Sequence, residues 1–180
     1  MNLKQHLRER HLDLELHRPM LDEAEGVATF YLWNLSGQIV GYQQYRPFAS
    51  KSFDNNPREG RYFTYRNRHY PTVGVWGLES FYLTPGVLFV VEGVFDAARL
   101  TELGVSAIAV LGNDPQADTR NWLMSLNRLI VVVADNDKAG RELAKFGHVA
   151  VFTEDHDLGD SSEEFVNSLI QKYVKRKQSV

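Results

Sequence analysis

Residues 86–98 read GVLFVVEGVFDAA, and residues 128–143 read RLIVVVADNDKAGREL. Each stretch contains an uninterrupted run of aliphatic and aromatic residues, which is typical of a strand buried on both faces of a parallel sheet. In each stretch, an acidic residue follows the predicted strand directly, and apolar residues at helical spacing come next. The two stretches therefore predict strand–helix units of an open α/β sheet.

The same alternation extends on both sides of these stretches. Further apolar runs at 107–111 and 149–152 predict two more strands, and helical patterns cover 95–103, 118–126, 138–146 and a last segment after 161. Connections of this kind are right-handed and make the strands parallel. We expect residues 86–180 to form an α/β domain with a mainly parallel four-stranded sheet flanked by helices and a C-terminal helix.

The first 85 residues have a different pattern. Residues 27–35 and 38–45 are rich in β-branched and aromatic residues around Ser36-Gly37, which predicts a β-hairpin. A short strand is expected at 62–65 after a loop over 46–61, while residues 1–26 fit helix or strand equally well. We expect residues 1–85 to form a small mixed α+β lobe. Three tryptophans, Trp33, Trp76 and Trp122, are expected in the core.

Composition excludes several classes of protein. The chain has 180 residues, 43% of them hydrophobic, and no Cys, which excludes a disulfide framework and every Cys-containing zinc module. It has no apolar run of transmembrane length and no N-terminal secretory signal. These features predict a cytoplasmic protein that contacts no membrane.

The net charge of −3 conceals an uneven distribution of charge. Residues 42–70 carry six Lys/Arg against two Asp/Glu, whereas residues 86–165 carry six against fourteen. A basic lobe beside an acidic one is typical of a polyanion-binding surface next to a cation site, although two solvated faces explain the charges equally well.

Carboxylates follow three of the predicted parallel strands. Glu92 comes after 87–91, Asp135 and Asp137 come after 129–134, and Asp157 and Asp160 come soon after 149–152. Ligands of open parallel sheets bind at the carboxyl ends of the strands, and clustered carboxylates suit Mg²⁺ or Mn²⁺. Acids at these positions can instead cap the following helices, an alternative that is strongest for Asp160.

Two motifs resemble those of the Toprim domain found in DNA primases, topoisomerases and some nucleases. They are Glu92-Gly93-x-x-Asp96 after one strand and Asp135-Asn136-Asp137-Lys138-Ala139-Gly140-Arg141 after another. Upstream, Gly37 to Gly41 with Arg46, then Lys51-Ser52-Phe53, then Trp76-Gly77-Leu78, resemble the lobe that precedes Toprim in DnaG-type primases. The order of these elements is similar to that of a primase RNA polymerase core in a small stand-alone phage or plasmid form.

This resemblance implies a DNA primase that makes short RNA on single-stranded DNA from NTPs, with two Mg²⁺ or Mn²⁺ ions and no zinc. It implies that Asp135 and Asp137 are metal ligands and that Glu92 is a ligand or a general acid/base. It extends the metal set to Asp96, Asp157 and Asp160, although His156 stands where the family has Lys. For Asp96, a helix-dipole role in the first turn is an equal alternative.

The basic residues are expected to bind NTPs or nucleic acid. Arg46 and Lys51 resemble the pair that contacts the triphosphate or the template in these primases. Cations and aromatics alternate over 61–70, a composition that suits single-stranded nucleic acid but also a strand in the core. The expected binding residues are Arg46, Lys51, Arg61, Arg66, Arg68, Lys138 and Arg141.

Two other functions remain open. The same acids serve a Toprim nuclease, and a non-catalytic replication accessory subunit would keep the fold. The family usually carries a zinc-binding domain that helps to read the template, and this chain has no Cys. We therefore expect weak synthesis that improves with a replicative helicase or a separate template-recognition protein.

Overall fold

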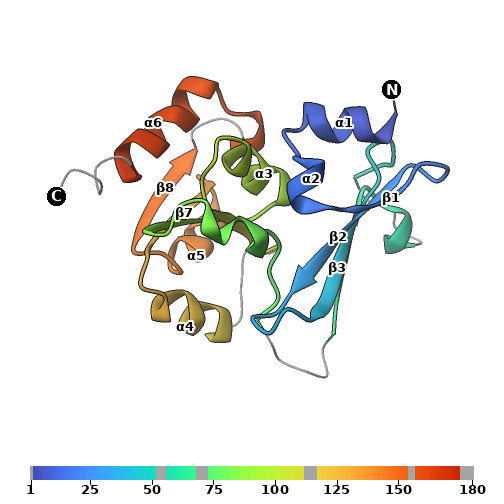
Figure 1. Ribbon diagram of the computed structural model, residues 1–180. Helices are drawn as coiled ribbons and strands as arrows, with labels where there is room; N and C mark the ends of the chain where they lie inside the picture. Colours follow the sequence, from blue (N-terminus) through green and yellow to red (C-terminus); the bar gives the residue numbers. More distant parts are fainter. Residues whose placement is uncertain (1, 52–55, 68–72, 112–116, 154–156, 175–180) are drawn as a thin grey trace.

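The computed structural model of the protein contains two four-stranded sheets, one antiparallel and one parallel (Figure 1). It describes residues 2–51, 56–67, 73–111, 117–153 and 157–174. In Figure 1 the antiparallel sheet, in blue and cyan, lies to the right, and the parallel sheet with its helices, in green to red, lies to the left.

The antiparallel sheet has the order β1-β2-β3-β4. Its elements, with the short helices around it, are α1 (Leu3–Glu9), α2 (Leu14–His17), β1 (Met20–Asp22), β2 (Val27–Trp33), β3 (Ile39–Tyr45), η1 (Pro57–Glu59) and β4 (Tyr62–Arg66). The predicted hairpin is confirmed: the Asn34 carboxamide oxygen accepts from the backbone N–H groups of Ser36 and Gln38, and Gly37 supplies a positive φ of 73°. The sheet and α1–α2 form the expected mixed α+β lobe.

The second sheet has the order β6-β5-β7-β8 with every pair parallel, which confirms the predicted fold class. Its elements are β5 (Val87–Val91), α3 (Val94–Glu102), β6 (Ala107–Ala109), α4 (Ala117–Ser125), β7 (Leu129–Asp135), α5 (Lys138–Ala144), β8 (Val149–Thr153), η3 (Leu158–Asp160) and α6 (Glu163–Tyr173). β5 is buried at every residue because it lies in the middle of the sheet with helices on both faces.

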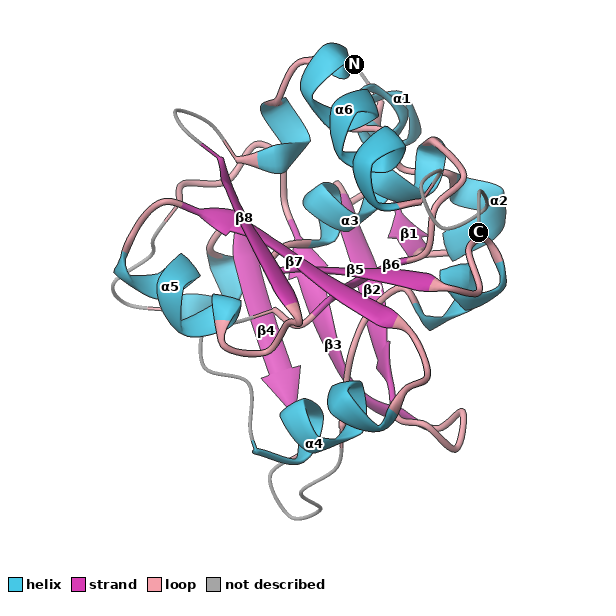
Figure 2. Ribbon diagram, turned by 90° about the vertical axis from the view of Figure 1, so that its left-hand side faces the viewer, coloured by secondary structure: helices cyan, strands magenta, loops and turns pink. Residues whose placement is uncertain are grey.

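Helices cover both faces of the parallel sheet (Figure 2). On one face, α3 and α6 pack through residues such as Leu100 and Leu169. On the other face, α4 and α5 contribute Leu123 and Leu143. The sheet is therefore shielded on both sides, and its polar groups emerge only at its ends.

The two lobes share one hydrophobic core. Phe30 of β2 and Tyr45 of β3 belong to the same buried cluster as Val91 and Phe95, and the ring centroids of Phe30 and Phe95 are 6.0 Å apart. Backbone bridges from Trp33 to Val75 and from Trp76 to Ala109 join the sheets, and η2 (Leu78–Tyr82) follows them. A domain boundary at 85/86 stays a prediction.

Several details differ from the sequence prediction. Trp76 is buried, at 2% exposed, but Trp33 is half-buried and lies in neither core. The reason is strand alternation, because Phe30 and Leu32 take the inward positions of β2. The expected loop over 46–61 contains η1. Among the described residues, no helix combines the length and the apolar character needed to cross a membrane.

Candidate metal and nucleotide site

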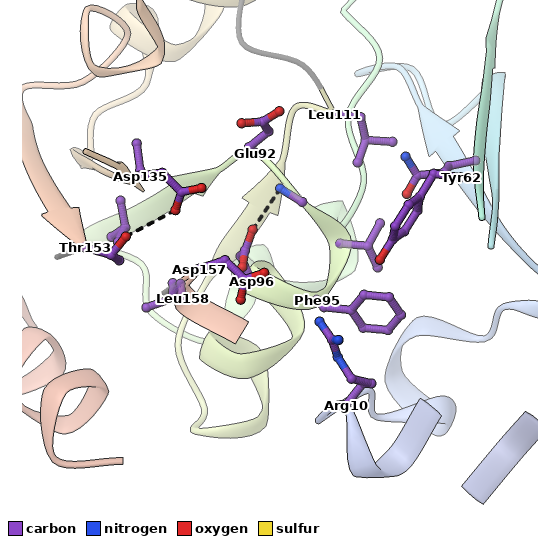
Figure 3. Close-up of a pocket in the computed structure, with 15 residues that line it drawn as sticks. Arg10, Tyr62, Glu92, Phe95, Asp96, Leu111, Asp135, Thr153, Asp157 and Leu158 are labelled. Carbon is purple, nitrogen blue, oxygen red and sulfur yellow. Dashed lines mark hydrogen bonds between the residues drawn. The ribbon is translucent and has the colours of Figure 1, made fainter. Parts of the chain in front are cut away.

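A cavity of about 350 Å³ opens at the carboxyl ends of the parallel strands (Figure 3). Glu92 follows β5, Asp135 ends β7, and β7 pairs with β8 so that Asp135 stands beside Thr153. Of the six predicted metal ligands, four line the cavity: Glu92, Asp96, Asp135 and Asp157. The topology therefore gathers residues that lie up to 65 positions apart in the chain.

The carboxylates around this cavity repel one another. Partial burial raises the pKa of Glu92, and the negative charges of Asp135 and Asp137 raise it further. Burial also raises the pKa of Asp157, with a contribution from Asp160 that nearby Arg10 opposes. A bound cation would relieve this repulsion, because it stabilises the charged form of every carboxylate near it.

Asp135 and Asp137 have different surroundings although they are two residues apart. Asp135 is exposed, lines the cavity, and accepts a hydrogen bond from the Thr153 hydroxyl at 3.2 Å. Asp137 is the N-cap of α5: its Oδ1 accepts from the Gly140 backbone N–H at 2.7 Å. Asp137 does not line the cavity in this structure, and one of its oxygens holds the helix in place.

Asp96 is held by two backbone hydrogen bonds. Its Oδ2 accepts from Gly93 N–H at 3.1 Å (Figure 3), and its Oδ1 accepts from Gly159 N–H at 2.9 Å. Burial, reinforced by the charge of Asp157, raises the pKa of Asp96 to about 7. The Asp96 side chain thus connects the first turn of α3 to η3. The sequence had offered a structural role in the first turn of the helix as an alternative to metal binding, but it did not indicate the contact with η3.

The last two predicted ligands belong to η3. Asp157 is the N-cap of this short helix and accepts from the Asp160 backbone N–H at 3.0 Å. Asp157 also lines the cavity, whereas Asp160 is exposed and does not. His156, which replaces the family's Lys, lies outside the described residues.

The donor set fits a hard divalent cation in chemistry, since every acidic group at the cavity offers carboxylate oxygens. Among the described residues, no three acidic or His side chains are already grouped as a metal site. Glu92 and Asp135 are exposed, and within the described chain the Glu92 carboxylate accepts no hydrogen bond. The Glu92 side chain is therefore free to turn toward an ion that it would share with Asp135, whose Oδ1 keeps its hydrogen bond from Thr153.

The predicted basic residues are dispersed, and none of those described lines the cavity. Arg61 donates to the Ala49 carbonyl at 3.1 Å, and Arg66 donates to the Val110 carbonyl, which joins β4 to the end of β6. Arg46 donates to the Gln44 carboxamide oxygen at 3.1 Å, and Lys51 is exposed. Arg68 lies outside the described residues.

The remaining two predicted cations lie on α5. Lys138 is the first residue of this helix and is exposed. Arg141 is also exposed and donates to the Asn136 carboxamide oxygen at 3.4 Å. Both therefore stand beside the loop that carries Asp135 and Asp137.

Sequence reasoning missed four polar residues of the cavity wall: Arg10, Gln43, Tyr62 and Thr153. The Arg10 guanidinium lies over the Phe95 ring, 4.6 Å from its centroid, and faces the carboxylates (Figure 3). Burial raises the pKa of Tyr62 to about 12, so its hydroxyl remains a hydrogen-bond donor at working pH. Tyr62 lay within a segment already singled out, but nothing in the local sequence marked Arg10.

Comparison with known proteins supports this description of the fold. Residues 89–156 match the model of the Toprim-like family. No curated protein sequence matches the chain significantly. Among solved structures, the zinc-binding and RNA polymerase domains of the Aquifex aeolicus primase match with a TM-score of 0.62 and 21% identity, over 91% of this chain and 45% of that one.

Two further structures show the same likeness. A DnaG primase catalytic domain bound to single-stranded DNA matches with a TM-score of 0.61 and 18% identity, over 95% of this chain and 59% of that one. The primase fragment of the bacteriophage T7 primase-helicase protein matches with a TM-score of 0.59 and 14% identity, over 92% and 68%. The chain thus spans about half to two thirds of these structures. Residues 89–156 are a Toprim-like segment, and more than nine tenths of the chain has the fold of a part of DnaG-type primase catalytic domains.

Proposed function

We propose that this protein is a primase-type nucleotidyltransferase that joins ribonucleotides on a single-stranded DNA template. One observation carries the proposal: Glu92, Asp96 and Asp135 of the Toprim-like segment, with Asp157 directly after it, share a cavity with Arg10, Gln43 and Tyr62 of the N-terminal lobe. A nucleotidyltransferase needs carboxylates for cations and, opposite them, donors for phosphate oxygens. This cavity offers both.

Two residues, Asp135 and Glu92, would hold the first divalent cation, and Asp137 would join after releasing part of its hold on α5. When bound, Mg²⁺ or Mn²⁺ supplies charge neutralisation for the triphosphate. In the reaction, the 3′-hydroxyl oxygen of the growing strand bonds to the α-phosphorus of the incoming NTP while the bond to pyrophosphate breaks. Glu92 takes the hydroxyl proton through the carboxylate oxygen that does not hold the cation.

Arg10 and Tyr62 would orient the NTP. The Arg10 guanidinium stands on the Phe95 ring and forms no ion pair within 4.0 Å among the described residues, so its donors remain available for phosphate. The Tyr62 hydroxyl can donate to a phosphate or ribose oxygen. Lys138 and Arg141 would contact phosphates from the α5 side of the same rim.

The test is incorporation of labelled NTPs on random single-stranded DNA with Mg²⁺ or Mn²⁺. New oligoribonucleotides made by the wild type and lost in Asp135→Asn support the proposal. Shortened DNA instead would identify a Toprim nuclease. If intact protein that binds the template gave neither product, the chain would be a non-catalytic accessory subunit.

Partners form a second part of the proposal. The structurally similar T7 primase fragment belongs to a primase-helicase protein, which supports a replicative helicase as the partner of this chain. The cavity lining presents groups for phosphate and metal, and such contacts carry no base sequence. Addition of the helicase is therefore expected to raise product yield. Efficient synthesis from one defined start site by the isolated chain would contradict this expectation.

A further inference from the structure

The face of the antiparallel sheet that points away from the cavity carries a row of aromatic side chains. Cross-strand register places Tyr31 of β2 opposite Tyr42 of β3, and Tyr42 opposite Tyr65 of β4. Trp33 comes two residues after Tyr31, and Phe63 comes two residues before Tyr65. Because side chains alternate along a strand, both lie on the same face. These five residues, Tyr31, Trp33, Tyr42, Phe63 and Tyr65, are called the outer aromatic row.

The rings of the row contact each other in two groups. Tyr42 stacks on Tyr65 with centroids 5.4 Å apart and lies 6.3 Å from Phe63, and Tyr31 meets Trp33 edge-on at 6.3 Å. Over the described chain, none of the five belongs to either hydrophobic core, and Tyr65 is 48% exposed. The other four rings are half-buried, and Tyr31 and Trp33 also line a hollow with His17 and Trp76. The end of the row formed by Tyr42, Phe63 and Tyr65 therefore presents aromatic surface that the described part of the fold leaves partly open.

Cations gather at the Phe63 end of the row. The Arg58 guanidinium lies 5.7 Å from the Phe63 centroid. Arg46 donates through Nη2 to Gln44, which is the cross-strand neighbour of Phe63 on this face, while its Nη1 is buried without a hydrogen-bond partner among the described residues, so Arg46 has to shift its side chain to bind a phosphate with that atom. Neither Arg46 nor Arg58 forms an ion pair within the described chain. The positive charge of this end is therefore not neutralised by the described part of the chain.

We propose that the outer aromatic row binds single-stranded nucleic acid, with bases stacked on Tyr42, Tyr65 and Phe63 and phosphates held by Arg46 and Arg58. Every base has a π-face, so stacking on aromatic rings is tolerant of sequence, and neighbouring arginines neutralise the backbone. Aromatic residues and Arg are also enriched at protein interfaces, so composition alone does not decide the occupant. Nucleic acid is favoured because Arg46 and Arg58 have no acidic partner among the described residues, and a polyanion supplies one.

The route from this face to the cavity runs around β4, the edge strand of its sheet. Alternation along β4 turns Phe63 and Tyr65 outward and Tyr62 inward, where it lines the cavity. A nucleic-acid strand bound by the outer aromatic row is therefore separated from the proposed catalytic groups only by β4. The inference rests on the proposed function in one respect, which is that the bound nucleic acid is the template.

The experiment measures the Kd of a fluorescein-labelled oligothymidylate by anisotropy. Tyr65→Ser and Tyr42→Leu are each expected to raise Kd about 5-fold or more, the smallest effect expected when one base loses its stacking partner. Tyr82→Ser is the matched control, because Tyr82 is 69% exposed on η2 and lies outside the row. Circular dichroism and urea unfolding show which variants keep the fold.

Salt dependence separates the roles of ring and cation. Arg58→Gln should lower the slope of log Kd against log salt by about 0.7, the effect of one phosphate contact on a single strand. Tyr65→Ser should weaken binding and leave that slope unchanged. If Tyr65 and Arg58 only stabilised the fold, their substitutions would not differ in this way, with one changing the salt slope and the other changing Kd alone.

Three outcomes would overturn the inference: an unchanged Kd in folded Tyr65→Ser and Tyr42→Leu, an equal loss in Tyr82→Ser, or a wild-type dimer in sedimentation that Tyr65→Ser makes monomeric. The last result would assign the row to self-association. Oligonucleotide binding is measured without NTPs, so it does not depend on RNA synthesis. If the row variants lost binding while the wild type made no RNA, the proposed function would be refuted and this inference retained.

Discussion

At the scale of single residues, the cavity depends on charge more than on packing. Asp135→Asn should reduce NTP incorporation by at least about 100-fold, because it removes a carboxylate where cation charge is needed. The Thr153 hydroxyl can still donate to the new carboxamide oxygen, so the free energy of unfolding should change by less than about 1 kcal/mol.

A second readout tests the same substitution without catalysis. Removal of the Asp135 charge should lower the pKa of Glu92, which NMR titration of the metal-free protein measures. Asp118→Asn, an exposed acid on α4, is the matched control. Full activity of Asp135→Asn at millimolar Mg²⁺ would remove Asp135 from the metal site.

The raised pKa of Asp96 predicts a pH dependence of stability. Between the unfolded value, near 3.9, and about 7, the folded state keeps a proton that the unfolded state releases. Rising pH therefore lowers the free energy of unfolding in this window, by up to about 1.4 kcal/mol per pH unit from this group. Urea unfolding of the EDTA-treated protein at pH 5 and pH 7 should show the decrease.

Asp96→Asn should flatten that pH profile, whatever its effect on stability at one pH. Asn retains an acceptor for one of the two backbone N–H groups that Asp96 binds, while its amide group cannot titrate. Asp118→Asn should leave the profile as it is. An unaltered slope in Asp96→Asn would mean that other groups cause the pH dependence.

At the scale of elements, the joint between β7 and α5 sets the position of Asp135. A Cβ on Gly140 would lie 2.0 Å from the Asp135 carbonyl oxygen, so only glycine lets the helix approach the end of the strand. Gly140→Ala should cost roughly 2 kcal/mol or more and should also impair metal-dependent activity, because α5 must move.

Gly104→Ala is the control for that substitution. Gly104 has a φ of +77° and no atom within 4 Å of a built Cβ, so Ala there adds backbone strain of about 1 kcal/mol without a collision. Unfolding by urea and activity at fixed Mg²⁺ compare the two variants. Equal losses in both would contradict the predicted collision at Gly140, which lies within α5 and has no positive φ.

The sequence predicted the parallel sheet well because β5 and β7 are buried on both faces and consist of uninterrupted apolar residues. It predicted the antiparallel lobe less completely. α2 has four residues and β1 has three, too few to establish a period. The orientation of β4 residues was also open, because only pairing with β3 decides that Tyr62 faces the cavity and Tyr65 faces outward.

Some residues of the candidate site could be predicted from the sequence, and others could not. Motif spacing identified Glu92 and Asp135 because they directly follow buried strands, and parallel strands bring their ends together. Arg10 could not be found by such reasoning, since it comes from the other lobe and reaches the cavity only through the packing of Leu7 and Leu12 in the shared core. Asp96 was found, but its two backbone hydrogen bonds were not foreseeable.

At the scale of the whole molecule, one buried histidine joins the lobes on a side away from the cavity. His17 of α2 donates through Nδ1 to the Glu79 carboxylate and is hydrogen-bonded through Nε2 to the Thr101 hydroxyl at 2.9 Å. Its ring also lies 4.2 Å from that of Trp76. These contacts connect α2 to η2 and α3, and so fix the N-terminal lobe against the Toprim-like segment.

His17→Ala should therefore affect both stability and substrate binding. Loss of the ring leaves Glu79 and Thr101 without their partner and opens a gap beside Trp76, which should lower the free energy of unfolding by about 2–4 kcal/mol. Because Arg10 and Tyr62 reach the cavity from the loosened lobe, KM for NTPs should rise more than kcat falls. His148→Ala, which removes one hydrogen bond to Ile130 at the parallel sheet, is the control. A normal KM in folded but destabilised His17→Ala would contradict this prediction. It would mean that the His17 contacts stabilise the protein without positioning Arg10 and Tyr62 at the cavity.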